Sequence, residues 1–185
     1  SEICLVGVTP LDGSAVQFAS YVELDSIDPA EGDKDITTVN MANGGRVVKK
    51  TPQGDSEVTL KLYEIEIGTG ASLAQHYHGT SDATAPLESV NSHTRNLFQV
   101  SFLWTDDTAA SVAEGTTASG NYARRLSFKD LRMTSYKETT EDGTLVINVT
   151  FKGPAFNQAN TGLVTRQSVA SDDGSGLSAL SSYTS

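Results

Sequence analysis

The sequence has little of what several protein classes require. Its 185 residues include one cysteine, Cys4, which excludes a disulfide framework and a thiolate metal cluster within one chain. Only 13 Lys and Arg stand against 23 Asp and Glu, so the chain lacks the clustered cations with which proteins grip nucleic-acid phosphates. No apolar run approaches the roughly 18 to 20 residues of a membrane-spanning helix. The start lacks the basic residues of a secretory signal, and we expect a soluble chain without an export signal.

The composition that remains is that of one acidic domain. Hydrophobic residues make up 37% of the chain, enough to close one core, and the net charge is -10. An acidic chain with many Ser and Thr also suits a high-salt cytoplasm, in which repulsion between carboxylates is screened.

Hydrophobic residues alternate with a period of two, which indicates half-buried strands and an all-β fold. In residues 97–104, Phe98, Val100, Phe102 and Trp104 share one face. Residues 144–151 alternate in the same way directly after the turn Glu141-Asp142-Gly143, and residues 124–134 are the expected partner strand. The parity of that partner changes near Lys129-Asp130, which predicts a β-bulge.

Further strands are predicted upstream. A hairpin is expected from 36–40 and 46–50 around Asn43-Gly44-Gly45, followed by a strand over 58–67 with a bulge near Glu64 and preceded by one over 14–24. We expect at most one short helix, at 70–75, and a loop over 76–93. The predicted domain spans 1–167, and the Ser-, Gly- and Asp-rich residues 168–185 are expected to form a flexible arm.

One segment has an enzyme-like pattern. His76 and His78 would lie on the same side of a strand and could chelate one metal with Asp82, as in the first motif of cupins, which makes a cupin-like metalloenzyme one alternative. The match is incomplete, because His93 lacks the surroundings of the second cupin motif. The other interpretation is a polar loop, and we expect no metal site and no cofactor.

Nothing else in the sequence indicates catalysis. Serine hydrolases of the Gly-x-Ser-x-Gly type are excluded because that motif is absent, and Gly68-Thr69-Gly70 lacks the Lys and further Gly of a phosphate-binding loop. Asn148-Val149-Thr150 fits a glycosylation acceptor, but alternation around it predicts polar positions on a strand. We therefore expect that the protein is not an enzyme.

Two blocks resemble the major tail tube proteins of long-tailed phages and archaeal viruses. The first comprises residues 33–39 (DKDITTV), 43–46 (NGGR), 50–55 (KTPQGD) and 57–62 (EVTLKL). The second comprises residues 124–135 (RRLSFKDLRMTS), 141–144 (EDGT) and 151–155 (FKGPA). In that family such blocks form two hairpins that line a tube.

The resemblance implies a β-sandwich or barrel whose two hairpins complete a barrel between subunits. Rings, usually hexameric, would stack into the tail tube of a virion, assembled in the host cytoplasm. The implied partners are other copies of the chain and the tape measure, tail terminator and baseplate proteins, without a membrane. Genomic DNA would pass without specific binding, because a negative lumen does not attract it.

Strand parity and charge then suggest residue roles. The predicted lumen-facing residues lie opposite the core positions of their strands: Glu57, Thr59, Lys61, Asn148 and Thr150. The predicted subunit interface lies in residues 40–55: Asn43, Gly44, Arg46, Val47, Val48, Lys49, Lys50 and Pro52. A solvated hairpin face is the other interpretation of these cations, and a virion decoration or receptor-contact β-sandwich is the other structural function.

Overall fold

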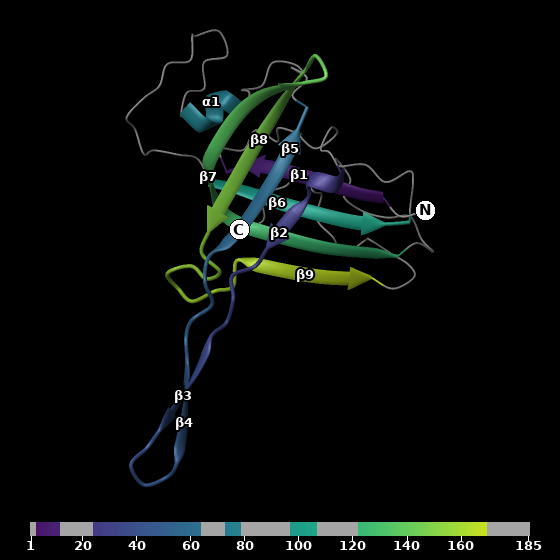
Figure 1. Ribbon diagram of the computed structural model, residues 1–185. Helices are drawn as coiled ribbons and strands as arrows, with labels where there is room; N and C mark the ends of the chain where they lie inside the picture. Colours follow the sequence, from purple (N-terminus) through teal and green to yellow (C-terminus); the bar gives the residue numbers. More distant parts are fainter. Residues whose placement is uncertain (1–2, 12–23, 64–72, 79–96, 107–121, 170–185) are drawn as a thin grey trace.

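The chain folds mainly into β-strands, and the computed structural model describes residues 3–11, 24–63, 73–78, 97–106 and 122–169 (Figure 1). The strands in these ranges are β1 (Ile3–Pro10), β2 (Asp28–Ala30), β3 (Ile36–Asn40), β4 (Arg46–Lys50), β5 (Ser56–Leu62), β6 (Leu97–Thr105), β7 (Ala123–Glu141), β8 (Thr144–Gly153) and β9 (Val164–Val169). The helices are the 3-10 turn η2 (Leu24–Ser26) and α1 (Leu73–His78). The predicted all-β fold with one short α-helix is confirmed. Within the described ranges, no helix is long and apolar enough to span a membrane.

The strands form one seven-stranded antiparallel sheet and one separate hairpin. The sheet has the order β1-β6-β7-β8-β5-β2, and β9 pairs with β7 outside this path. The hairpin of β3 and β4 is a sheet of its own and projects away from the body (Figure 1). The body therefore holds the core, and the hairpin is an appendage.

The 19-residue strand β7 joins the two halves of the sheet. Its first half pairs with β6 and β9, and its second half pairs with β8. In Figure 1, β5 and β8 cross β1, β6 and β9 at a steep angle. The sheet thus curls over itself and encloses one core.

Aromatic and aliphatic side chains from both halves meet in that core. Phe98 of β6 and Phe151 of β8 are both fully buried, with ring centroids 5.3 Å apart in an edge-to-face arrangement. Burying each such side chain contributes on the order of 2 kcal/mol to folding. The predicted core faces of β5, β6 and β8 are confirmed for these buried residues: Val58, Leu60, Leu62, Phe98, Val100, Phe102, Ile147, Val149 and Phe151.

The pairing of β7 corrects the predicted hairpin. The bulge near Lys129-Asp130 is confirmed, because the register of β6 and β7 shifts there and Asp130 has φ 54°. The predicted partner of β8, residues 124–134, was wrong for most of its length, because β8 pairs with Arg132 to Glu141. A second register shift between Met133 and Ser135 conceals this half of β7 from a period-two search.

The predicted bounds of the other elements agree with the structure to different degrees. The hairpin strands 36–40 and 46–50 are confirmed at both ends. The helix lies at Leu73–His78, so it begins and ends three residues later than the predicted helix at 70–75. Its last three residues occupy the start of the predicted loop. Leu24 lies in η2 instead of a strand. The rest of the strand over 14–24, the bulge near Glu64 and residues 79–93 lie outside the described residues.

Strand β9 extends into the predicted arm. It runs to Val169, so the first two residues of 168–185 pair with β7. The remainder of the arm lies outside the described residues, and its flexibility stays a prediction.

Candidate subunit interface and channel face

The tip of the β3–β4 hairpin is closed by its own hydrogen bonds. The Met41 amide donates to the Gly45 carbonyl at 2.8 Å, and the Gly44 amide donates to the Met41 carbonyl at 3.0 Å. The Asn43 side-chain oxygen accepts from the Gly45 amide at 3.0 Å. Gly44 has φ 82°, a left-handed conformation that glycine adopts without strain. The Asn-Gly-Gly sequence therefore fixes the turn locally.

The hairpin is exposed along its whole length. Every residue of β3 and β4 is exposed, including Ile36 at 65%, Val47 at 51% and Val48 at 54%. Arg46, Lys49 and Lys50 lie on the same strand. An isolated two-stranded hairpin is marginally stable in water, and exposed apolar surface of this kind is typical of interaction sites.

The root of the hairpin is tightly constrained. The Thr51 amide donates to the Asp35 carbonyl at 2.9 Å, and the Gly54 amide donates to the Asp33 carbonyl at 3.0 Å. A Cβ on Gly32 would lie 1.9 Å from the Gly54 carbonyl oxygen, so the two segments approach within a distance that only glycine permits. This close packing sets the direction in which the hairpin leaves the body.

An ion pair ties the root to the body. Arg166 of β9 contacts Glu31 with 2.5 Å between Nη1 and Oε1. Glu31 directly precedes Gly32, so β9 and the start of the hairpin are held together.

The five predicted lumen-facing residues lie on one face of the body. Thr59 pairs with Thr150, and Lys61 pairs with Asn148, so these four side chains share a face. Glu57 lies two residues before Thr59 on the same strand and is exposed. The opposite face of β5 carries the buried Val58, Leu60 and Leu62. Their common placement is thus as predicted, while their position in a channel stays a prediction.

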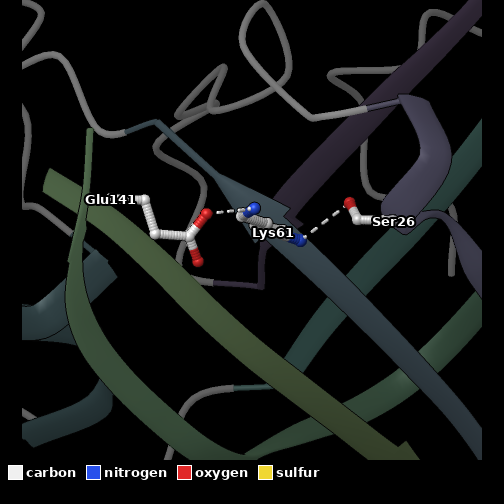
Figure 2. A network of polar contacts seen from close by, with 3 residues as sticks. All are labelled: Ser26, Lys61 and Glu141. Atoms are coloured by element: carbon white, nitrogen blue, oxygen red, sulfur yellow. Dashed lines mark hydrogen bonds and ion pairs between the residues drawn. The ribbon is translucent and has the colours of Figure 1, made fainter. Parts of the chain in front are cut away.

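Ion pairs connect this face across strands. Lys61 Nζ donates to Glu141 Oε2 at 2.6 Å, and the Lys61 amide donates to Ser26 Oγ at 3.1 Å, as Figure 2 shows. The two contacts join the ends of β5, β7 and η2. A solvent-accessible ion pair such as Lys61–Glu141 contributes about 0.2–1 kcal/mol.

A second pair lies at the other end of the face. Lys152 Nζ lies 2.7 Å from Glu57 Oε2. The hydrogen bond and the charge of Glu57 raise the pKa of Lys152 above its usual value. Both pairs reduce the net field that the face presents to solvent.

The polar face is not acidic, in contrast to the chain. Strand register aligns charged residues of both signs on it: the basic Lys61, Arg132, Lys137 and Lys152 and the acidic Asp28, Glu57 and Glu141. Among the described residues of this face, basic side chains slightly outnumber acidic ones. The acidic excess of the sequence therefore lies elsewhere, and the predicted negative lumen has no support from these strands.

The histidine motif lies on a helix, which differs both from the predicted loop and from the strand that the metal-site alternative requires. His76 and His78 belong to α1, whereas the same-side argument requires a strand. Asp82 and His93 lie outside the described residues. Within the described ranges, no three His, Cys, Asp or Glu side chains are grouped so that they could hold a metal ion.

One surface feature was missed by the sequence reasoning. Leu145 has the parity of the buried Ile147, but its side chain is 47% exposed because β8 begins beyond the core. The exposure of Leu145 could have been predicted from the length of β7 and β8, because both strands continue past the last layer of core residues.

Solved structures share this fold across most of both chains. A chain of the sheath/tube terminator of the extracellular contractile injection system PVC, in its extended state, aligns with TM-score 0.52 and 12% identity, over 89% of this chain and 92% of that one. A chain of the PVC sheath-tube complex aligns with TM-score 0.52 and 11% identity, over 90% and 88%. The tube-terminating cap of the anti-feeding prophage aligns with TM-score 0.53 and 10% identity, over 90% and 88%.

These likenesses confirm a fold of the tail tube type. Neither family models nor curated protein sequences match the chain. At such low identity, the fold is what the comparisons establish, and the phage or archaeal assignment stays a prediction.

Proposed function

We propose that this chain is a structural subunit that assembles with copies of itself into stacked rings and so forms the tube of a tail or injection apparatus. The tail tube type of fold supports this, since the aligned structures are components of sheath-tube and tube-terminating assemblies. The role is structural rather than catalytic. The rings are hexameric in the family that the sequence resembles, and we propose the same here.

The observation that carries the proposal is the unpartnered β3–β4 hairpin. A two-stranded ribbon with exposed Ile36, Val47 and Val48 is costly in a free monomer, because these apolar side chains contact water. A neighbouring subunit would cover them. The predicted interface residues are all exposed and available for such a contact: Asn43, Gly44, Arg46, Val47, Val48, Lys49, Lys50 and Pro52.

The polar face of β5 and β8 is the proposed channel wall. Its cross-strand ion pairs leave it with little net charge, so a passing polyanion would be neither held nor strongly repelled. Genomic DNA is the proposed passenger in a virion tail. The tape measure, tail terminator and baseplate proteins are proposed as further partners, with assembly in the host cytoplasm.

Negative-stain electron microscopy of the purified protein tests the assembly. We expect rings or hollow rods, with a matching fast-sedimenting species in analytical ultracentrifugation. A monodisperse monomer at high protein concentration, in both low and high salt, would contradict the proposal.

A further inference from the structure

The β3–β4 hairpin differs in charge from the rest of the chain. Residues 36–50 contain Arg46, Lys49 and Lys50 and no acidic residue, while the whole chain has a net charge of -10. Val39 and Val47 pair directly across the hairpin and are 44% and 51% exposed. The hairpin thus presents an apolar centre with a basic rim.

The opposite end of the molecule has the complementary character. Leu145, 47% exposed, pairs across strands with Thr140, and Glu138 precedes Thr140 by two residues and so shares its face. Asp142 is exposed in the adjacent turn. We call Glu138, Thr140, Asp142 and Leu145 the acidic tip.

Glu138 is held in place on this tip. The Tyr136 hydroxyl donates to Glu138 Oε1 at 3.1 Å. The neighbouring Lys137 lies on the other face of β7, aligned with Asn148 and Lys61. The exposed Leu145 therefore shares its face with Glu138, and the exposed Asp142 lies in the adjacent turn.

The two surfaces point in opposite directions. Figure 1 shows the hairpin projecting from one end of the body and the β7–β8 turn at the other end. They cannot meet within one chain, but they can meet between copies placed head to tail. A contact between two different surfaces of the same chain propagates into a filament when it does not close into a ring.

We propose that the β3–β4 hairpin of one copy docks on the acidic tip of the next copy along the tube. This inference rests on the proposed tube function and names the surface that receives the hairpin. Apolar side chains at the centre with opposite charges at the rim match the usual anatomy of protein interfaces.

Charge reversal at each end, separately and together, tests the contact. The hairpin variant carries Lys49→Glu and Lys50→Glu, and the tip variant carries Glu138→Lys and Asp142→Asn, since Asn tolerates the φ of 49° at this position. Circular dichroism first verifies that each variant folds. The readout is the protein concentration at which rods form, measured by pelleting and electron microscopy.

Each single-end variant is expected to need about tenfold more protein to form rods, because like charges face each other at the contact. The chain with both ends reversed is expected to return to within about threefold of the wild type. Arg124→Glu is the control for a charge reversal elsewhere, since Arg124 is exposed at the far end of β7 from the tip, and it should form rods as the wild type does.

If the chain with both ends reversed does not recover rod formation, the docking inference is overturned. Rods formed by the wild type would still support the proposed tube function. Normal rods from the tip variant, with none from the hairpin variant, would also overturn it and place the partner of the hairpin on another surface. Absence of rods and rings from the wild type itself would overturn the proposed function as well.

Discussion

Gly32 lies where two backbone segments meet at the root of the hairpin. A Cβ at this position would lie 1.9 Å from the Gly54 carbonyl oxygen and 2.7 Å from that of Asp55. Neither backbone atom can turn away as the end of a flexible side chain could. The direction of the hairpin therefore depends on a residue that has no side chain.

Gly32→Ala is expected to destabilise the protein by about 1–3 kcal/mol, because the clash forces the two backbone segments apart. Chemical denaturation measures the change in the free energy of unfolding. Gly162→Ala is the matched control, since nothing lies within 4 Å of a Cβ placed there. Equal stability of the two variants would contradict the close approach at Gly32.

At this scale, sequence reasoning located faces but not contacts. Alternation placed Thr59, Lys61, Asn148 and Thr150 on one face, and strand register brings them together. It could not identify the Lys61–Glu141 and Lys152–Glu57 pairs, because they depend on which strands are neighbours. Nor could it separate the charge of this face from that of the whole chain.

The strands differ in how clearly the sequence marks them. The hairpin strands β3 and β4 were predicted to the residue, because a turn that requires glycine fixes their register locally. β7 was predicted only in part, because its two register shifts interrupt the period of two. The Thr- and Gln-containing β9 lacks an apolar pattern, and pairing with β7 defines it instead.

The hairpin is expected to be dispensable for folding and required for assembly. Replacing residues 36–50 by Asn-Gly, which suits a two-residue turn between Asp35 and Thr51, removes a ribbon whose strand residues are all exposed. The thermal midpoint should change by less than about 4 °C, the shift produced by about 1 kcal/mol in a chain of this size.

Differential scanning calorimetry and sedimentation measure the two effects on the same sample. A large fall in the midpoint would show that the hairpin supports the core. Unchanged assembly without the hairpin would show that it is not the interface.

The whole molecule separates its charges by region. The hairpin is basic, and the polar face of the curled sheet carries nearly equal numbers of basic and acidic residues, although the chain as a whole is acidic. Net charge suggested a negative lumen, whereas the arrangement in space shows a nearly neutral polar face and a basic hairpin. The net charge of the sequence cannot distinguish these two arrangements, because it does not show which charged side chains share a surface.

Electron cryo-microscopy of the purified, assembled protein tests the central claim most directly. We expect a hollow tube of stacked rings in which Glu57, Thr59, Lys61, Asn148 and Thr150 line the channel and the β3–β4 hairpin contacts a neighbouring copy. A tube with those five residues on its outer surface, or a preparation that contains only monomers, would contradict the account.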